Sequence, residues 1–315
     1  MRFLVLGAGA VGGYFGGRLA AAGRDIRFLV RPERAKRLAA GGLRIVSPEG
    51  DVAIAPQLVI AGNNASKAAP ADAVLLGCKS YDLDAAIAAL RPHVGPDTMI
   101  VPLLNGLRHL ATLDAAFGAT CVLGGLCQIS ATLDDDGTIR HLGLSARLPF
   151  GERAGGMSPR VGRLATAMGG AGFEAPASAE IMQDMWEKFT ILATLAGASC
   201  LMRAPIGPII GSGGVGFIDA LAAECIATAT AAGFPPRRQF RDRIERLKDP
   251  SSTLAASMLR DIERGGPSEG NHVLGDLARR AAALGIATPV LDIAALHLAV
   301  YERYRLTPDG GAETP

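Results

Sequence analysis

Three glycines close to the amino terminus have a spacing that can bind a phosphate group. Gly7, Gly9 and Gly12 form the pattern G-x-G-x-x-G, which directly follows the apolar run 3–6 and precedes a helix-like stretch. At such a junction Gly7 permits a tight turn, Gly9 lets the main chain approach a pyrophosphate, and Gly12 lets helix and strand pack closely. The pattern therefore predicts a dinucleotide site whose remaining residues are Ala8, Ala10 and Val11. The alternative is a glycine-rich turn that is simply buried.

A basic residue stands where the second strand of such a fold ends. The apolar segment 26–30 predicts this strand, and Arg31 follows it directly. In dinucleotide-binding folds an acidic residue here binds the free 2′-hydroxyl of NADH, whereas a basic one suits the 2′-phosphate of NADPH. Arg31, with Arg34 and Lys36 after it, therefore favours NADPH. The alternative interpretation of these residues is a solvated basic helix start.

Polar residues also follow two later strands. Lys79 comes after the apolar segment 73–77, and Asn105 comes after a second apolar segment at 98–101. Because residues at the carboxyl ends of parallel strands line the ligand crevice, both are candidate cofactor contacts. A lysine in this position can equally be solvated, and an Asn-Gly pair at 105–106 also suits a tight turn.

One lysine is the only basic residue of the long apolar segment 181–202. This residue, Lys188, lies between Trp186 and Phe189. An ammonium group that is partly desolvated in such a helix, near a cleft, can act as a general acid. The alternative is a lysine whose apolar stem packs on the core while its charge reaches solvent. Glu269 stands at the expected start of a later helix, where a carboxylate can also be a simple cap.

The elements that must position these residues divide the sequence into two parts. A length of 315 residues suggests two domains. Strands alternate with helical segments over residues 1–178, which predicts a Rossmann-like, doubly wound α/β domain. Beyond residue 178 only helical periodicity remains, so residues 179–315 are expected to form an all-helical domain that holds the substrate.

Smaller elements are also expected within these two domains. Alternating apolar residues around a turn predict a hairpin over 41–60. Later strands are expected at 121–133, 138–141 and 147–150. Helices are expected at 82–90, 161–168, 181–202, 217–232, 253–264 and 288–304, and the basic segment 237–248 is expected to be a solvated face.

Charge and composition argue against several partners. The 32 basic and 30 acidic residues leave a formal charge of +2, too small to indicate nucleic acid or an anionic membrane. The uncharged runs fall short of the ~18 to 20 residues that a membrane span needs. The five cysteines lack C-x-x-C spacing, so we expect buried free thiols in a reducing cytoplasm. The acidic triplet 134–136 has turn composition, and no metal site is expected.

Several motifs taken together resemble one protein family. The sequence resembles the ketopantoate reductase (2-dehydropantoate 2-reductase) family along nearly its whole length. The matching segments, in chain order, are 7–13, Arg31, 78–82, 104–106, 186–188, 257–261 and Glu269. The resemblance implies a nucleotide domain joined to a helical domain, with NADPH and a 2-keto acid meeting in the cleft between them.

The resemblance also implies a role for each site residue. Lys188 resembles the proton donor to the substrate carbonyl oxygen, and Glu269 resembles the carboxylate that helps to hold substrate or cofactor. Ser257 would hydrogen-bond the substrate carboxylate, Asn105 would contact nicotinamide and substrate, and Lys79 would line the same site. The implied reaction is reduction of ketopantoate to pantoate, a step of pantothenate biosynthesis.

The sequence departs from the family pattern at positions that would contact the substrate. Where the family commonly has asparagines, this chain has Leu192, Ala196 and Leu254, and Asn271 replaces an acidic residue after the glutamate. Because lost amide hydrogen bonds change which acid is preferred, ketopantoate and a more apolar 2-keto acid are both expected candidates. Two other interpretations stay open: an NADPH-binding regulator that has lost catalysis, and an opine-type dehydrogenase that requires an amine. A homodimer is compatible with the resemblance.

Overall fold

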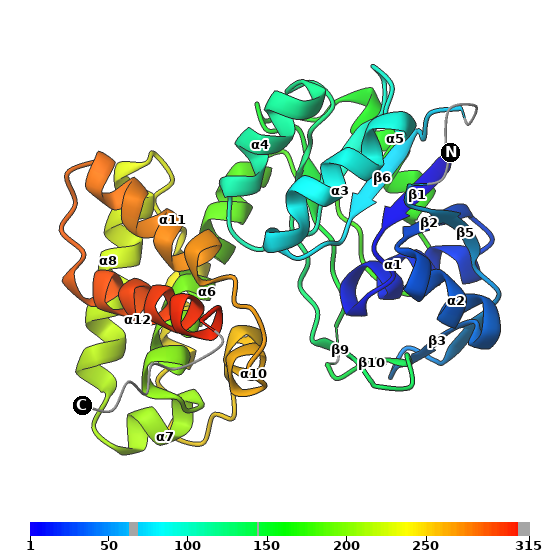
Figure 1. Ribbon diagram of the computed structural model, residues 1–315. Helices are drawn as coiled ribbons and strands as arrows, with labels where there is room; N and C mark the ends of the chain where they lie inside the picture. Colours follow the sequence, from blue (N-terminus) through cyan, green and yellow to red (C-terminus); the bar gives the residue numbers. More distant parts are fainter. Residues whose placement is uncertain (63–68, 144, 308–315) are drawn as a thin grey trace. The chain divides into compact units, whose positions relative to one another are not determined.

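The computed structural model describes residues 1–62, 69–143 and 145–307. The chain divides into two compact units, which are described separately (Figure 1). The first comprises Met1–Leu104 and His109–Met182, and the second comprises Asn105–Arg108 and Gln183–Pro315. The division after Met182 lies close to residue 178, where we place the domain boundary. No pattern in the sequence indicates that the segment Asn105–Arg108 belongs to the helical unit.

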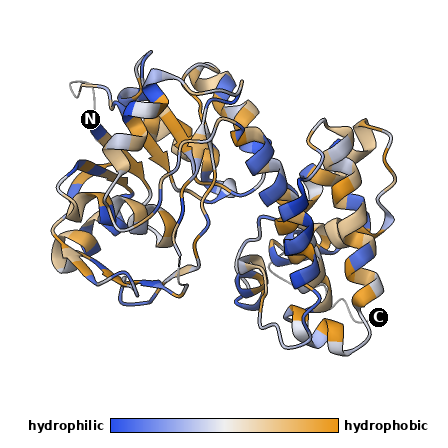
Figure 2. Ribbon diagram, turned by 180° about the vertical axis from the view of Figure 1, so that it is seen from behind, coloured by the Kyte–Doolittle hydropathy of each residue, from blue (hydrophilic) through white to orange (hydrophobic). Residues whose placement is uncertain are grey.

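The first unit is built on a parallel sheet of five strands in the order β5-β2-β1-β6-β7. The strands are β1 (Arg2–Leu6), β2 (Asp25–Val30), β5 (Gln57–Ile60), β6 (Ala73–Leu76) and β7 (Met99–Pro102). In the central register Val5 pairs with Phe28 on one side and Leu75 on the other. The three inner strands consist mainly of buried apolar residues, as expected for a sheet covered on both faces; Figure 2 shows them largely in orange. This confirms the doubly wound α/β fold.

The first helix packs closely because four of its residues are glycines. A Cβ atom on Gly16 would lie 2.7 Å from the Phe28 ring, and one on Gly17 would lie 2.7 Å from Ile45. The glycines therefore let α1 (Ala10–Ala21) approach both the parallel sheet and a second sheet. The other helices of this part of the chain are α2 (Pro32–Gly41), η1 (Ser80–Asp82), α3 (Leu83–Leu90), η2 (Arg91–His93), α4 (Arg108–Phe117) and α5 (Pro159–Met168).

A second, four-stranded sheet has the order β4-β3-β10-β9. Its strands are β3 (Leu43–Val46), β4 (Val52–Ile54), β9 (Ala131–Leu133) and β10 (Ile139–His141). The expected hairpin is confirmed, because Leu43 pairs antiparallel with Ile54. The expected strand over 121–133 was wrong, since that segment contains only the short β8 (Gly124–Gly125), which pairs with β11 (Phe150–Gly151), and then β9. The first part of the segment pairs with 147–151, through β11 and an isolated bridge between Gln128 and Arg147, whereas β9 pairs with β10 in the four-stranded sheet.

The second unit is helical throughout the part of it that the structure describes. Its helices are α6 (Ile181–Met202), α7 (Ile206–Gly211), α8 (Val215–Ala231), α9 (Arg238–Arg246), α10 (Ser257–Glu263), α11 (Gly270–Ala283) and α12 (Pro289–Arg305). Helix α11 packs along α12, and both pack against α8. The expected all-helical class is confirmed, and α6 has the bounds expected for the long apolar helix. Among the described helices, none combines the length and hydropathy that a membrane crossing requires.

Candidate active site

The glycine turn leaves open space in front of a helix. Gly7 ends β1 with φ +89°, and Gly9 is the N-cap of α1 and accepts the backbone N–H of Gly13 at 2.8 Å. A Cβ on Gly12 would lie 2.2 Å from the Gly7 oxygen, whereas one on Gly9 meets no described atom within 4 Å. The first backbone N–H groups of a helix have no partner inside the helix. The turn therefore fits a pyrophosphate at its open side.

The Arg34 side chain binds the backbone of this turn. Its Nε and Nη2 atoms donate to the Ala8 carbonyl oxygen at 3.1 and 2.9 Å. Burial, with the nearby Arg37, lowers the pKa of Arg34. Lys36 pairs with Glu33 at 2.8 Å. Arg34 therefore has a structural role that its position in the sequence did not reveal, and Lys36 remains exposed in a surface ion pair.

Arg31 lies at the carboxyl edge of the sheet, at the N-cap of α2. Its Nη2 atom is 2.5 Å from Oδ1 of Asp82. Asp82 ends η1, the turn that follows β6 and has the half-buried Lys79 as its N-cap. The predicted cofactor residues Gly7, Arg31 and Lys79 thus follow three adjacent strands, β1, β2 and β6, at one edge. The pairing of Arg31 with Asp82 was not predicted.

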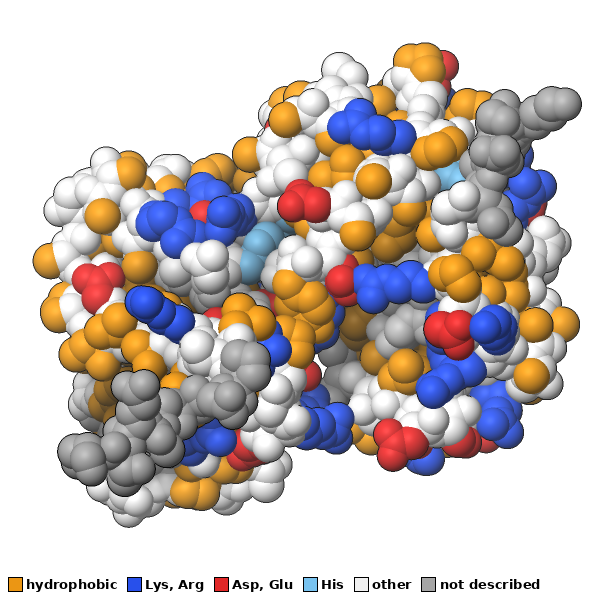
Figure 3. All heavy atoms as spheres, in the orientation of Figure 1, with side chains coloured by type: hydrophobic (Ala, Val, Ile, Leu, Met, Phe, Trp, Pro, Cys, Tyr) orange, Lys and Arg blue, Asp and Glu red, His pale blue; other side chains and the backbone are white. Residues whose placement is uncertain are grey.

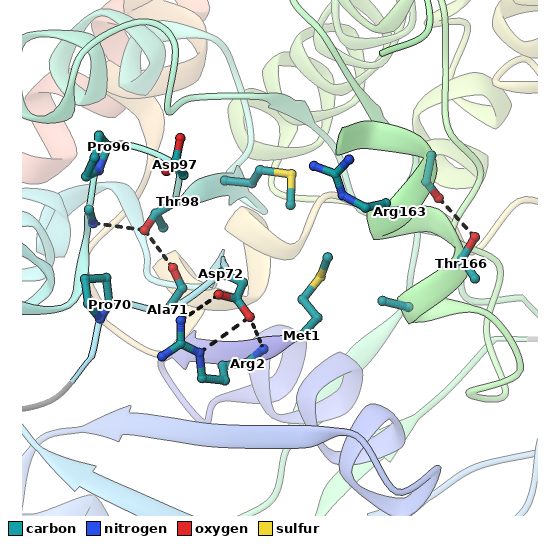
Figure 4. A pocket seen from close by; sticks show the side chains of 14 residues that line it. Met1, Arg2, Pro70, Ala71, Asp72, Pro96, Asp97, Thr98, Arg163 and Thr166 are labelled. Carbon is teal, nitrogen blue, oxygen red and sulfur yellow. Dashed lines mark hydrogen bonds and ion pairs between the residues drawn. The ribbon is translucent and has the colours of Figure 1, made fainter. Parts of the chain in front are cut away.

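A separate cavity of about 940 Å³ opens at the opposite edge of the sheet (Figure 4). It is lined by residues at or before the starts of β1, β6 and β7, and by α5. Arg2 crosses it to Asp72, with 2.7 Å between Nη2 and Oδ1, and the Thr98 hydroxyl donates to the Ala71 oxygen at 2.7 Å. None of the residues predicted to bind cofactor or substrate lines this cavity.

The helical unit joins two of the predicted catalytic and substrate residues. Nζ of Lys188, on α6, donates to Oδ1 of Asn105 at 3.1 Å. Asn105 precedes Gly106, whose φ of +75° confirms the expected turn. Both residues belong to this one unit, so the contact is internal to it. The lysine is half-buried and its ammonium group has an amide acceptor, which favours the site role over simple extension into solvent.

A histidine that the sequence analysis did not single out holds the Asn105 segment. The buried His272 lies on α11, and its ring donates a hydrogen bond to the Asn105 backbone carbonyl. A Cβ on Gly106 would lie 3.2 Å from the His272 oxygen, so the turn lies directly against the helix. Burial lowers the pKa of His272, although Glu269 and Asp276 act in the opposite direction. His272 therefore favours the neutral form.

Glu269 is the N-cap residue of α11 and is buried. Its backbone oxygen accepts the His272 N–H at 3.0 Å, and its side chain makes no capping hydrogen bond. The simple capping interpretation is therefore not what the structure shows. Since Glu269 influences the charge state of His272, which bonds to Asn105, these residues form one connected group with Lys188.

The residues beside Lys188 fix its helix. Glu187 is buried and accepts the Arg237 backbone N–H and Nε, both at 2.9 Å. Burial alone would raise the pKa of Glu187, but the hydrogen bonds from Arg237 lower it below its usual range. The Trp186 ring stacks on Phe234 with centroids 5.5 Å apart. Arg237 thus anchors this segment of α6 while remaining exposed, as expected for the solvated basic segment 237–248.

The predicted substrate residue Ser257 is on a different helix of the same unit, α10. It is exposed at the first turn of α10, and among the described residues it has no hydrogen bond to Lys188, Asn105 or Glu269. Leu254, just before α10, is also exposed. On α6, Leu192 is half-buried and Ala196 is fully buried.

Thiol and metal chemistry have little support in the described part of the chain. None of the five cysteines forms a disulfide; four are buried and Cys78 is half-buried. Burial raises the pKa of the Cys200 and Cys225 thiols to about 12, so neither is a thiolate at neutral pH. Within residues 1–62, 69–143 and 145–307, no cluster of three or more His, Cys, Asp or Glu could hold a metal ion.

Two family models match the chain in sequence order. The model described as Ketopantoate reductase PanE/ApbA matches residues 3–155. The model described as Ketopantoate reductase PanE/ApbA C terminal matches residues 180–302. Together they cover the greater part of both units, and they confirm the resemblance seen in the sequence.

Individual proteins match over the same extent. The chain is 38% identical over 304 residues to the Bacillus subtilis protein called Uncharacterized oxidoreductase YkpB, covering 96% of this chain and 99% of that protein. It is 28% identical to the 2-dehydropantoate 2-reductase of Mesorhizobium japonicum, with 93% and 95% covered. The crystal structure of 2-dehydropantoate 2-reductase from Methylococcus capsulatus matches with a TM-score of 0.86 at 30% identity, covering 97% and 98%. The chain therefore belongs to the ketopantoate reductase family, and it is an oxidoreductase that acts on a CH–OH group and uses NADP.

Proposed function

We propose that this protein reduces a 2-keto acid to the corresponding 2-hydroxy acid with NADPH. The observation that carries the proposal is the 3.1 Å hydrogen bond from Lys188 Nζ to Asn105 Oδ1 inside the helical unit. It places a cation in a fixed position on an apolar helix, where a carbonyl oxygen that gains negative charge would be stabilised. NADPH, when bound, supplies the hydride that adds to the carbonyl carbon.

Lys188 stabilises the developing oxyanion and then transfers a proton to it. An ammonium group has three N–H donors, and the Asn105 oxygen accepts one of them. That hydrogen bond orients the ammonium without removing its positive charge. We assign Lys188 as the general acid and Asn105 as the group that positions it and contacts the substrate.

The other predicted residues contribute binding. We assign Glu269 to holding the substrate or cofactor, because its buried carboxylate acts on His272, which bonds to the Asn105 backbone beside Lys188. Ser257 is assigned to the substrate carboxylate, and its exposed position on the first turn of α10 leaves its hydroxyl accessible. At the carboxyl edge of the sheet, the turn at 7–12, Arg31 and Lys79 are assigned to NADPH.

The substrate is ketopantoate or a close relative with a more apolar side chain. The relatives called 2-dehydropantoate 2-reductase support ketopantoate, and with it a place in pantothenate biosynthesis. Leu192, Ala196 and Leu254 support a less hydroxylated acid, since aliphatic groups cannot hydrogen-bond a substrate hydroxyl.

Features of the surface and interior support proposals on the oligomeric state, the type of partner and the location of the protein. Exposed Ile293, Leu296 and Val300 recur along one side of α12 and would suit a homodimer contact; hydrophobic side chains are visible on the helical unit in Figure 3. Charged side chains of both signs are interspersed over the face shown there, which suits a small-molecule enzyme better than a nucleic-acid binder. The free cysteines support a cytoplasmic location.

The deciding experiment is NADPH oxidation measured against a panel of 2-keto acids that includes ketopantoate. Robust oxidation with any member supports the reductase and rules out a regulator that has lost catalysis. Activity that requires an added amine would instead indicate an opine-type dehydrogenase. No oxidation with any acid, despite tight NADPH binding, would favour the regulator.

A further inference from the structure

The ion pair between Arg31 and Asp82 joins two segments of the cofactor edge. Arg31 follows β2 and Asp82 follows β6, and these strands flank β1 on its two sides. The Arg31 Nη2 and Asp82 Oδ1 atoms are 2.5 Å apart. The arginine expected to bind the 2′-phosphate of NADPH thus already has an anionic partner in the protein.

Asp82 stands at a helix N-terminus, but its side chain does not cap the helix. Asp82 is the N-cap residue of α3, where an aspartate usually accepts a hydrogen bond from the helix. Here its side chain makes no capping hydrogen bond, and the carboxylate contacts Arg31 instead. The pair also contributes little to stability, because its side chains are 68% and 34% exposed.

Two neighbouring cations, Arg34 and Lys36, already have partners in the protein. Arg34 donates from Nε and Nη2 to the Ala8 oxygen, and Lys36 is paired with Glu33. A 2′-phosphate that reaches this edge therefore competes with the Asp82 carboxylate for the Arg31 guanidinium. Once it has displaced that carboxylate, the dianionic phosphate lies beside an uncompensated negative charge, which costs binding energy. NADH, which has a 2′-hydroxyl there, leaves the ion pair intact.

We propose that Asp82 is a determinant of cofactor specificity that weakens NADPH binding relative to NADH by competing for Arg31. The proposal rests on the cofactor site of the proposed function but not on the keto acid. Asp82 therefore opposes Arg31, and the balance between them sets how strongly the protein prefers NADPH.

The test is the dissociation constant of NADPH and of NADH, measured by fluorescence titration of the full chain without keto acid. Asp82→Asn should tighten NADPH binding and leave NADH binding nearly unchanged, so that the preference for NADPH rises about 3- to 10-fold. Arg31→Ala should lower the same preference, which verifies that the measurement reports on the 2′-phosphate. Glu33→Gln is the matched control, because it removes one nearby negative charge that pairs with Lys36 and not with Arg31.

Three results would overturn the proposal. The preference could stay unchanged in Asp82→Asn, or it could rise as much in Glu33→Gln, which would indicate a general effect of charge. It could also rise only because NADH binds more weakly, which would make Asp82 a ribose contact. Wild-type protein that binds neither dinucleotide would refute the cofactor site together with this inference, whereas failure of every keto acid in the activity panel would leave the binding result intact.

Discussion

The side chains of Lys188 and Asn105 meet at 3.1 Å although they lie 83 positions apart in the sequence. The contact exists because a short segment, Asn105–Arg108, leaves the first unit and packs in the helical one. The buried His272 holds that segment through the Asn105 backbone. The general acid proposed here is therefore positioned by a segment that the chain supplies from the end of a Rossmann-like strand.

Replacing Lys188 by methionine should abolish most of the reductase activity. Methionine keeps much of the apolar stem of the side chain but carries no proton and no charge, so kcat should fall about 10²- to 10⁴-fold. NADPH affinity should change little. Steady-state kinetics with a substrate from the 2-keto acid panel measures the effect, and Lys248→Met is the control, because Lys248 is paired with Asp219 on the same unit. A kcat within a few-fold of wild type would remove Lys188 from the chemistry.

Asn105→Ala should lower kcat by about 10-fold, because the ammonium loses the acceptor that orients it. The effect should depend on the lysine. In the Lys188→Met background the asparagine no longer positions a proton donor, so the second substitution should cost much less. Equal losses in both backgrounds would show that Asn105 acts on the substrate or cofactor independently of Lys188.

Local patterns were sufficient to predict most of the fold. The glycine turn, the parallel strands and α6 follow from spacing and periodicity, which depend on residues close in sequence. Helix α4 was missed, although the buried Leu110 and Leu113 have helical spacing. The segment 121–133 failed as one continuous strand because its two ends pair with different partners, β11 and β10, and this choice is set by tertiary packing.

The site was predicted less completely, because partners are chosen by packing. Residue types marked Lys188, Asn105 and Arg31 as candidates, but nothing local identifies Asp82 as the partner of Arg31 or His272 as a support for Asn105. Arg34 illustrates the same limit. As a basic residue near a phosphate site it suggested ligand binding, yet its guanidinium is directed to a backbone carbonyl of the same turn.

His272 should make the protein less stable in mild acid. Its pKa in the folded state lies below its ordinary value of about 6.5, so the unfolded chain binds a proton more readily than the folded one. Stability should therefore fall as the pH drops below about 6.5. His272→Gln removes this contribution while keeping an N–H donor, and urea unfolding at pH 7.5 and 5.5 should show a smaller difference than wild type. His297→Gln is the comparison, and an identical pH dependence in all three proteins would contradict the expectation.

Glu187 should stabilise the α6 segment at neutral pH through Arg237. The pKa of Glu187 is below its usual value, so this stability is present above the ordinary carboxyl range near pH 4.5 and is lost as pH falls through the folded-state value. Glu187→Gln should cost about 1 to 2 kcal/mol at pH 7 and less at pH 3.5. Glu245→Gln, in an exposed pair with Lys248, serves as control in chemical denaturation. A cost that does not shrink in acid would indicate lost packing instead of lost charge pairing.

Restoring amides at Leu192 and Leu254 should shift the substrate preference toward a hydroxylated acid. If these leucines line the keto acid site, Leu192→Asn combined with Leu254→Asn supplies hydrogen bonds that a hydroxyl-bearing substrate can use and an aliphatic one cannot. The ratio of kcat/KM for ketopantoate to that for 2-keto-3-methylbutanoate should then rise about 10-fold or more. Leu284→Asn, at another exposed leucine of the same unit, should leave the ratio unchanged. Equal loss of activity toward both acids would show that the leucines support the fold and do not read the substrate, and specificity would then have to be sought around Ser257 and Glu269.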